Sequence, residues 1–523
     1  MTAEATARSS KNDRPVVDTT NGPVRGVDDG IVKSWKGIRY AAAPVGELRW
    51  RAPEPPAAWT EPADAARVGP VCPQPTDPKI PLDLGAPQGE DFLVLNVWAP
   101  SGAQPGDDKP VMVWVHGGAY VLGSASQPLY HGRALATGGD VIVVTVNYRL
   151  GALGFLELST VGDDTRRFAT NVGLRDVLAA LQWVRDNIAA FGGDPRRVTL
   201  FGESAGGGIV TSLLGSPAAA GLFSAAIAQS SPATSTYELS RAGRVAERFL
   251  EVLGAGRHDL PALADAPLKT LIEASRTVFN EVPVRKPGTL AFTPTVDGDL
   301  LPDYPVNLAR DGKTHAVPLI IGTNKNEAAL FRYMKSPLMP IAPDSIKAMF
   351  NEIAAEQPGL PLPTEDVLKG TYRGRGKAKG LGLTSDLGFR MPSIWFADGH
   401  RKVAPVYLYR FDFATPLLRL ARLHAAHATE LPFVWGNLGS GRKDPTFALG
   451  GRKAGTEVSR RMQTRWANFA THGVPDGPAD EPRWRPYDDD DRATLVIDKH
   501  DTVVDDLDAH VRRAWGDDVL SFL

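Results

Sequence analysis

Short apolar runs alternate with stretches of helical periodicity through the middle of this chain. Residues 111–115 form an apolar run and residues 141–146 a continuous β-branched one, the pattern of strands covered on both faces. Residues 171–190 instead place apolar side chains at helical spacing, and this pattern stops at Phe-Gly-Gly-Asp-Pro over residues 191–195. Another apolar run starts at Val198. Strand, helix and strand in this order predict an α/β fold with a large, mostly parallel central sheet and helices on both faces.

The flanking sequence predicts more strands and one helical insertion. Alternation with glycine turns over residues 16–40 predicts an antiparallel hairpin. Between residues 331 and 403 the pattern becomes helical and irregular, and we expect this segment to be a mainly helical cap or regulatory insertion over the sheet. Further strands are expected at residues 92–98, 225–228, 317–321, 406–413 and 494–497.

The composition gives no sign of a nucleic-acid or membrane partner. Lys plus Arg number 58 and Asp plus Glu number 60, so the formal net charge is −2. No global basic field is present to attract nucleic acid or an anionic membrane. No apolar run is long enough to span a bilayer. We therefore expect no nucleic-acid partner and no membrane anchor, while the oligomeric state stays open.

The N-terminal residues and the cysteine content favour a reducing setting. Residues 1–15 lack the apolar core of a signal peptide, and we expect them to be a flexible tail before a single domain over residues 16–523. Cys72 is the only cysteine, so no intrachain disulfide is possible. Both observations favour a cytoplasmic location.

Residues 198–208 carry the most informative pattern of the chain, Val-Thr-Leu-Phe-Gly-Glu-Ser-Ala-Gly-Gly-Gly. A predicted strand there meets Gly-Glu-Ser-Ala-Gly, and the residues through Leu214 suit a helix, so Ser204 is expected on a strand-to-helix turn. Such a turn is too tight for side chains two positions before and after the serine, and it pushes the hydroxyl outward. A Gly-rich helix start is the alternative, but the strand, the helix and the glycine run together favour a nucleophile.

Small residues at two places predict an oxyanion hole. Ala205 would open the helix with an unpaired N–H at the positive end of the helix dipole, where negative charge is stabilised. Gly118 and Ala119 follow the strand predicted at residues 111–115, within His-Gly-Gly-Ala-Tyr. Their backbone N–H groups can point into a cavity without a side chain in the way. An ordinary glycine turn is the alternative for this second segment.

With these segments placed, the chain resembles the type B carboxylesterase family of α/β-hydrolases, and most of all the bacterial carboxylesterases of the para-nitrobenzyl esterase kind. The likeness extends from about residue 16 to residue 497. It implies a single catalytic domain of the α/β-hydrolase fold, with helical insertions over the active site. It rests on the motifs at residues 19–26, 36–41, 48–50, 90–97, 116–120, 147–151, 191–195, 202–207, 322–327, 430–437 and 466–469.

The chain also departs from the family's pattern. Phe92 stands where many secreted members carry a cysteine, whereas Cys72 matches the partner position. The resemblance therefore implies that the usual first disulfide is missing. Val177 stands where glutamine is usual, and Tyr120 where phenylalanine is commoner.

A nucleophilic serine needs an imidazole to take its proton and a carboxylate to fix the tautomer of that imidazole. In α/β-hydrolases the acid and then the histidine follow the serine along the chain. Glu327 comes just after the strand predicted at residues 317–321, at the edge where parallel sheets bind ligands, and it matches the family's acid position. Asp297 is the competing acid, which we interpret as a turn residue.

Two neighbouring histidines compete for the role of base. The family's spacing to Glu-Leu-Pro-Phe at residues 430–433 selects His427, and His424 is interpreted as a surface or packing residue. His116 lies upstream of the nucleophile, and the resemblance implies a structural role for it.

The residues and the resemblance together predict a serine carboxylesterase that acts on a small-molecule ester substrate. Ser204 would attack an ester carbonyl, His427 would accept and then donate the proton, and Glu327 would stabilise the imidazolium before water hydrolyses the acyl-enzyme. No metal or organic cofactor is needed. Ser230 resembles a supporting serine behind the acid. Glu203, beside the nucleophile, either tunes the binding of cationic substrates or has a structural hydrogen-bonding role.

Two alternatives remain at this level. The same triad can hydrolyse amides, carbamates, thioesters or polyesters. The family also includes adhesion and hormone-precursor proteins that bind partners without catalysis, although these have typically lost a triad member. The acyl and alcohol pockets are expected from loops around residues 73–89 and 331–403.

Overall fold

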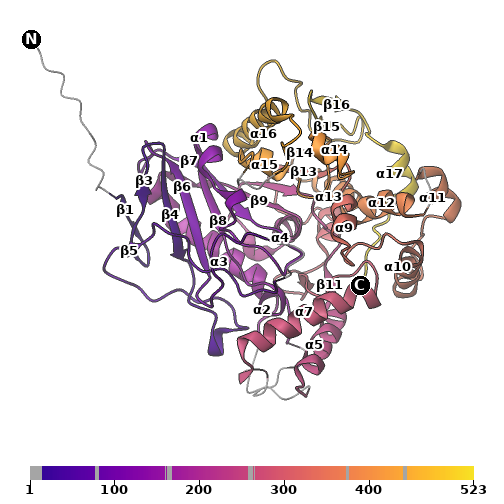
Figure 1. Ribbon diagram of the computed structural model, residues 1–523, viewed down its shortest axis with the longest axis horizontal. Helices are drawn as coiled ribbons and strands as arrows, with labels where there is room; N and C mark the ends of the chain where they lie inside the picture. The colour runs from indigo at the N-terminus through magenta and orange to yellow at the C-terminus, as the bar shows by residue number, and fades with distance from the viewer. Residues whose placement is uncertain are drawn as a thin grey trace, which may run out of the picture.

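The computed structural model describes residues 14–76, 82–159, 161, 168–256, 263, 265–372, 376–439 and 445–523. The tail expected over residues 1–15 therefore lies almost wholly outside the described residues. An eleven-stranded sheet runs through the molecule (Figure 1). Its strands, in spatial order, are β16 (Thr502–Val504), β15 (Thr494–Ile497), β14 (Val406–Phe411), β13 (Leu319–Asn324), β10 (Ala225–Gln229), β9 (Gly193–Glu203), β7 (Lys109–Val115), β8 (Ile142–Val146), β6 (Val94–Pro100), β4 (Val32–Arg39) and β3 (Val27–Asp28).

The strands from β15 to β8 are all parallel to their neighbours, and the antiparallel pairs lie at the two ends of the sheet. Parallel strands end at the same edge, so the segments that follow β7, β9, β10, β13 and β14 gather on one side of the sheet. These segments carry the site residues predicted from the sequence.

The N-terminal strands differ in one respect from the expected single hairpin over residues 16–40. Strands β1 (Val16–Thr19) and β2 (Gly22–Arg25) form a hairpin of their own, extended by β5 (Ala63–Asp64), whereas β3 and β4 form a second hairpin in the large sheet. Gly22 explains the early turn because its φ of +141° is open to glycine but not to other residues. A further small sheet pairs β11 (Tyr237–Glu238) with β12 (Thr295–Val296).

The helices follow the strands in the rhythm expected of an α/β chain. They are α1 (Arg133–Gly139), α2 (Gly151–Gly154), α3 (Val172–Asn187), α4 (Ala205–Leu214), α5 (Leu239–Leu253), α7 (Leu268–Arg285), α8 (Pro305–Arg310), α9 (Ala328–Met334), α10 (Pro343–Glu356), α11 (Glu365–Thr371), α12 (Lys377–Ser385), α13 (Met391–His400), α14 (Pro416–Leu420), α15 (Leu431–Trp435), α16 (Arg452–His472) and α17 (Ala509–Trp515). Shorter helical turns are η1 (Gly46–Leu48), η2 (Pro128–Tyr130), η3 (Ile188–Phe191), η4 (Pro217–Ala219) and the π-helical η5 (Asp386–Arg390).

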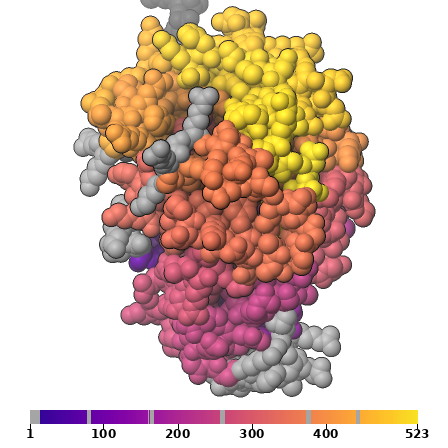
Figure 2. Space-filling view, turned by 90° about the vertical axis from the view of Figure 1, so that its right-hand side faces the viewer, coloured from indigo at the N-terminus to yellow at the C-terminus, as the bar shows by residue number. Residues whose placement is uncertain are grey.

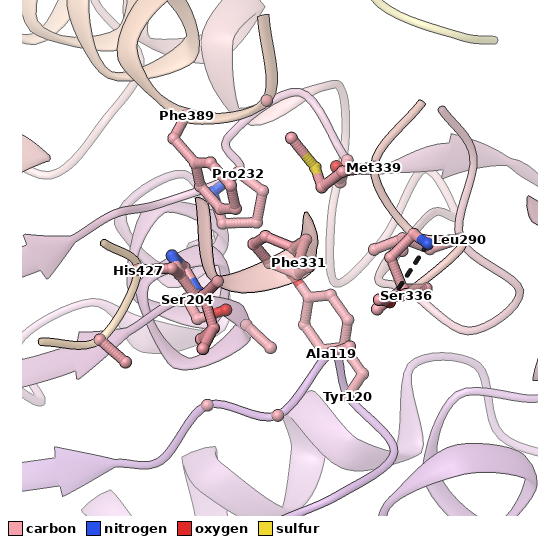
Figure 3. A pocket seen from close by; sticks show the side chains of 18 of the residues that line it. Ala119, Tyr120, Ser204, Pro232, Leu290, Phe331, Ser336, Met339, Phe389 and His427 are labelled. Atoms are coloured by element: carbon pink, nitrogen blue, oxygen red, sulfur yellow. Dashed lines mark hydrogen bonds between the residues drawn. The ribbon is translucent and has the colours of Figure 1, made fainter. Parts of the chain in front are cut away.

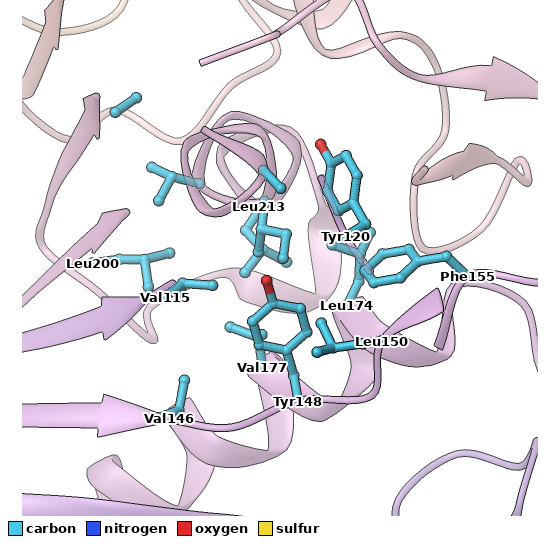
Figure 4. Close-up of a cluster of buried hydrophobic side chains, with 14 of the residues drawn as sticks. Val115, Tyr120, Val146, Tyr148, Leu150, Phe155, Leu174, Val177, Leu200 and Leu213 are labelled. Atoms are coloured by element: carbon cyan, nitrogen blue, oxygen red, sulfur yellow. The ribbon is translucent and has the colours of Figure 1, made fainter. Parts of the chain in front are cut away.

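Helices cover both faces of the large sheet. On β7, Val115 belongs to the buried cluster that contains Leu174 of α3 and Leu213 of α4 (Figure 4). The preceding residue, Trp114, belongs to the cluster that contains Trp466 of α16. Successive side chains of a strand point to opposite faces, so apolar cores lie on both sides. This confirms the mostly parallel sheet with helices on both faces that the sequence predicts.

The segment between residues 331 and 403 is rich in helices. It holds most of α9, all of α10 to α13 and the π-helical η5. In Figure 2 this orange segment fills the middle of one face of the molecule, with the magenta helices below it and the yellow C-terminal residues above it. Among the helices of the described residues, none is both long enough and apolar enough to cross a membrane.

A buried ion pair joins the end of β8 to helix α3. The Arg149 guanidinium donates to both carboxylate oxygens of Asp176, with Nε–Oδ2 and Nη2–Oδ1 distances of 2.8 and 2.6 Å. The two side chains are only 1% and 0% exposed. Arg149 Nη1 also donates to the backbone oxygens of Leu48, Arg49 and Arg51. One guanidinium therefore ties an N-terminal loop, the sheet and α3 together.

The Asp176→Asn variant tests how much this pair contributes to stability. The substitution keeps the size of the side chain but leaves the buried guanidinium without a counter-charge, so we expect the free energy of unfolding to fall by about 3–5 kcal/mol. Urea denaturation measures it. As a matched control, Asp311→Asn breaks an exposed ion pair with Lys313, and little or no change is expected. Equal losses in the two variants would contradict the role given to Arg149.

Candidate functional site

Ser204 lies on the turn between β9 and α4, as its sequence motif predicts. Its backbone has φ 57° and ψ −124°, an unusual conformation for a residue other than glycine. The turn is held by hydrogen bonds at both ends, because Ser204 N donates to Gln229 O at 2.9 Å and Gly208 N donates to Ser204 O at 2.9 Å. The side chain of Ser204 therefore faces the cavity at the end of the sheet.

Glycines make this turn possible. A Cβ on Gly206 would lie 2.0 Å from the backbone oxygen of Val115, and one on Gly202 would lie 2.6 Å from the backbone of Gly206. A Cβ on Gly117 would come within 3.0 Å of Ser204 Cβ. The turn that carries the serine is thus pressed against the loop after β7, and only glycine fits at these contacts.

Three backbone N–H groups belong to residues that line the cavity beside Ser204. These residues are Gly118 and Ala119 after β7 and Ala205 at the start of α4. Among the described residues none of these N–H groups has a hydrogen-bond acceptor. Gly118 and Ala119 hold positive φ angles of 119° and 53°. Unpaired donors that converge beside a serine form a pocket for a negatively charged oxygen.

Glu327 and His427, one hundred residues apart in sequence, are in direct contact. Glu327 follows β13 at the start of α9, and its Oε2 lies 2.7 Å from His427 Nδ1. The backbone N of His427 also donates to Glu327 O at 3.4 Å. Ser230 Oγ and Asn324 N donate to the other carboxylate oxygen, Oε1, at 2.6 and 2.7 Å. These bonds fix the carboxylate, which in turn fixes a proton on Nδ1 and leaves Nε2 as the acceptor.

His427 and Ser204 face the same cavity (Figure 3). The rings of Phe331 and Phe389 pack on the imidazole, with centroid distances of 5.1 and 4.6 Å. No hydrogen bond joins Ser204 Oγ to His427 within the described part of the chain. Such a contact is often looser in a free enzyme than in its complex with substrate.

Glu203 brings a second carboxyl group to the imidazole. Its Oε1 lies 3.2 Å from His427 Nε2, but the direction of approach makes no hydrogen bond, so the contact is electrostatic. Burial raises the pKa of the Glu203 carboxyl well above its usual value. Burial alone would lower the pKa of His427, but the charges of Glu203 and Glu327 outweigh it and raise that pKa above its ordinary value. Protonation of Glu203 removes one of these charges and so favours the neutral imidazole.

Glu430 is a third buried carboxyl that the sequence analysis does not single out. It accepts hydrogen bonds from Gln229 Nε2 at 3.0 Å and from Asn324 Nδ2. Burial raises its pKa, and its charge also contributes to the raised pKa of His427. Its position in the sequence could have indicated this role. Glu430 stands three residues after His427 and directly before the apolar Leu-Pro-Phe, and an acidic residue that is buried with such neighbours needs hydrogen-bond partners.

The competing candidates lie elsewhere. His424 is exposed. Asp297 accepts hydrogen bonds from the backbone N of Asp299 and Leu301, as expected for a turn residue. His116 is buried beneath the loop after β7, where burial lowers its pKa to about 4 and its Nδ1 lies 2.9 Å from Gly117 O. The described residues contain no cluster of His, Cys, Asp or Glu side chains placed to hold a metal ion.

The cavity beside Ser204 has a volume of about 390 Å³. Residues of the 331–403 segment contribute much of its lining, including Phe331, Met339 and Phe389, and Leu82 contributes from the 73–89 segment, as expected. Two further walls were not anticipated. They come from residues 288–290 before β12 and from residues 520–522 near the end of the chain.

Comparison with known proteins gives a consistent picture. The sequence profile of the carboxylesterase family matches residues 13–515. The chain is 38% identical over 506 residues to a para-nitrobenzyl esterase of Bacillus subtilis, covering 95% of this chain and 98% of the relative. It is 34% identical to an acylcarnitine hydrolase of Mus musculus, covering 97% and 92% of the two chains.

Solved structures agree with the sequence comparison. A carboxylesterase of Geobacillus stearothermophilus superposes with a TM-score of 0.83 at 37% identity, covering 96% of this chain and 100% of the other. A structure described as a PNB esterase gives a TM-score of 0.82 at 36% identity, with the same coverage. The chain therefore has the α/β-hydrolase fold expected from the sequence.

The electrostatic part of this description can be tested by titrating His427. In Glu203→Gln, a carboxylate beside Nε2 is replaced by a neutral amide of the same shape, so we expect the pKa of His427 to fall by about one pH unit or more. Side-chain ¹⁵N NMR of histidine-labelled protein measures the pKa, with the signal assigned from its loss in His427→Gln. The control is Glu157→Gln, which changes a buried carboxyl that bonds Ser159 instead. A pKa that does not move in Glu203→Gln would show that the Glu203 charge does not reach the imidazole.

Proposed function

The chain belongs to the carboxylesterase family and is a carboxylic ester hydrolase, and on that premise we propose that Ser204, His427 and Glu327 are its nucleophile, base and acid. The convergence of Ser204 and the bonded Glu327–His427 pair on one cavity supports this assignment. Strands β9, β13 and β14 end at the same edge of the parallel sheet. The segments that follow them carry Ser204, Glu327 and His427, respectively.

In the first half of the reaction Ser204 Oγ attacks the ester carbonyl. His427 Nε2 takes the serine proton as the Oγ–C bond forms, and Glu327 stabilises the resulting imidazolium across the 2.7 Å contact to Nδ1. The tetrahedral intermediate then expels the alcohol, which receives the proton from Nε2. The product of this half is an ester between Ser204 and the acyl group.

The N–H groups of Gly118, Ala119 and Ala205 would hold the oxyanion of that intermediate. They have no acceptor among the described residues, so they are free to bond an oxygen without first breaking another contact. Donors fixed in this way stabilise charge as it develops, and removing one typically costs on the order of a hundredfold or more in rate.

In the second half of the reaction water acts as the nucleophile in place of Ser204. His427 removes a proton from water, which attacks the acyl-enzyme, and the collapse of the second tetrahedral intermediate releases the acid and returns the proton to Ser204 Oγ. No metal or organic cofactor takes part in these proton transfers. Ser230 acts here as a positioning residue, because its hydroxyl donates to the Glu327 oxygen that does not contact His427.

The helical segment over residues 331–403 would act as a cap over this chemistry. Phe331 and Phe389 of this segment pack on the imidazole, and Met334 and Met339 line the cavity. These side chains favour a substrate with a large apolar part, and they exclude water from His427. The single cysteine of the sequence, buried at position 72, supports a cytoplasmic location for the enzyme.

Substitution of each triad member tests the assignment. Ser204→Ala removes the nucleophile, so we expect the burst of 4-nitrophenol from an aryl ester to vanish and kcat to fall by about 10⁴-fold or more. The His427→Ala variant should lose a similar amount, and Ser204→Ala/His427→Ala little more than either alone, because the residues act as a unit. A matched panel of esters, amides and carbamates on wild type then defines the bond that is cleaved. A burst that persists in correctly folded Ser204→Ala would contradict the proposal.

The pH dependence of wild type tests the role of His427 as base. Only the neutral imidazole accepts the serine proton, so kcat/KM should be lost as the pH falls through the pKa of His427. Because neighbouring carboxylates raise that pKa, the midpoint of the acid limb is expected above the value of about 6.5 of a free imidazole. In Glu203→Gln the limb should move to lower pH. An acid limb with a midpoint at or below that of a free imidazole, and unchanged in Glu203→Gln, would show that another group is the base.

A further inference from the structure

The end of the cavity away from His427 is closed by the last described residues of the chain. Leu520 and Phe522 line the cavity together with Met349 of α10 and Leu290, and each of Leu520, Phe522 and Met349 is almost fully buried. A Cβ on Gly288 would touch both Met349 Sδ at 2.8 Å and Phe522 Cε2 at 3.3 Å, so these side chains pack over that glycine. A wall of three sequence-distant segments results.

A buried arginine holds this wall in place. Arg241 of α5 donates from Nε to Leu523 O at 2.7 Å, and its Nη2 pairs with Glu356 at the end of α10. Its guanidinium carbon lies 5.2 Å from the ring centroid of Phe522 and 5.1 Å from that of Tyr237, so the charge lies close to two aromatic rings. The position of the Phe522 ring is thus fixed from outside the cavity.

Two further hydrogen bonds attach the same segment to the end of α10. Gln357 Nε2 donates to Ser521 O at 2.8 Å, and Leu523 N donates to Glu356 Oε2 at 3.1 Å. The C-terminal end of the chain accordingly lies beside α10 and β11 (Figure 1). With its backbone bonded on both sides of Phe522, the segment is a built part of the pocket.

The position of this wall relative to His427 identifies which part of an ester it faces. His427 protonates the departing alcohol, so the alcohol lies on the imidazole side of Ser204 and the acyl chain extends away from it. Leu290 lies on the side of Ser204 that is opposite to His427 (Figure 3). Phe522 belongs to the same wall, since Tyr237 accepts a hydrogen bond from Leu290 N at 3.0 Å and its ring lies 6.5 Å from that of Phe522.

We propose that residues 520–522, held by Arg241, form the end wall of the acyl pocket and set the longest acyl chain that the enzyme hydrolyses. This rests on the proposed function of Ser204 and His427. An acyl chain that ends short of Phe522 meets only apolar surface, whereas a longer one meets a ring that the Arg241 contacts hold in place. Chain length is therefore limited by a segment that takes no part in proton transfer.

The test is a ladder of 4-nitrophenyl esters from acetyl to dodecanoyl on wild type and Phe522→Ala. For the first chain length that wild type rejects, we expect kcat/KM to rise about tenfold or more in Phe522→Ala, since one methylene in an apolar pocket is worth about that much. The acetyl ester is the internal control, because its chain ends far from the wall, and its kcat/KM should stay within about twofold. Arg241→Met should move the cut-off in the same direction through a looser Phe522.

Leu523→Ala is the matched control, because Leu523 is in the same segment but is not among the described residues that line the cavity. It should leave the ladder unchanged. Phe522→Leu gives a smaller shift and replaces Phe522→Ala if that variant does not fold. An unchanged cut-off in folded Phe522 variants would overturn the proposal, as would a shift only on a ladder of acetate esters with longer alcohols. Wild type that hydrolyses no rung of either ladder would instead overturn the proposed function, and this inference with it.

Discussion

The close approach of two loops at one edge of the sheet is the constraint on which the rest of this structure depends. Strands β7 and β9 are parallel neighbours, so the loop after β7 and the turn after β9 must share the same space. They fit only because Gly117, Gly202 and Gly206 carry no side chains, as the 2.0 Å separation between a Cβ on Gly206 and Val115 O illustrates. That lack of side chains lets Gly118, Ala119 and Ala205, whose N–H groups have no acceptor among the described residues, line the cavity beside Ser204.

A group of buried carboxyls forms the second layer of the site. Glu203, Glu327 and Glu430 surround a single imidazole, and their charges raise its pKa against the effect of burial. Buried carboxylates are costly unless hydrogen bonds satisfy them, and Ser230, Asn324 and Gln229 provide those bonds for Glu327 and Glu430. The hydrogen bonds that stabilise the buried Glu327 carboxylate also fix its position, and Glu327 in turn orients the His427 ring.

Local patterns predicted the parts of the fold that depend on local physics. The strands at β7, β8 and β9, the helix α3 and the turn at Ser204 follow from runs, periods and glycines that lie together in sequence. The pairing of Glu327 with His427 does not, because one hundred residues separate them. Glu327 was predicted from its place after a strand and from the family's acid position, whereas His427 was selected by the family's motif spacing. Over residues 16–40 the alternation correctly predicted antiparallel strands, but it did not show that they divide into two hairpins in separate sheets, the first of which turns at Gly22. Nothing in the sequence indicated that Phe522 lines the cavity, because its position depends on contacts with Arg241 and α10, which are remote in sequence.

The proposed oxyanion pocket would recognise an oxygen atom and nothing else about a substrate. Backbone amides at Gly118, Ala119 and Ala205 present the same dipoles whatever side chains surround them, so in the proposed mechanism any acyl compound that becomes tetrahedral at this point would be stabilised to the same extent. Selectivity must then come from shape at the periphery, where residues can be exchanged without disturbing the reaction centre. In a scaffold of this kind, substitutions in the cavity wall can change the substrate during evolution while the residues of the reaction centre stay the same.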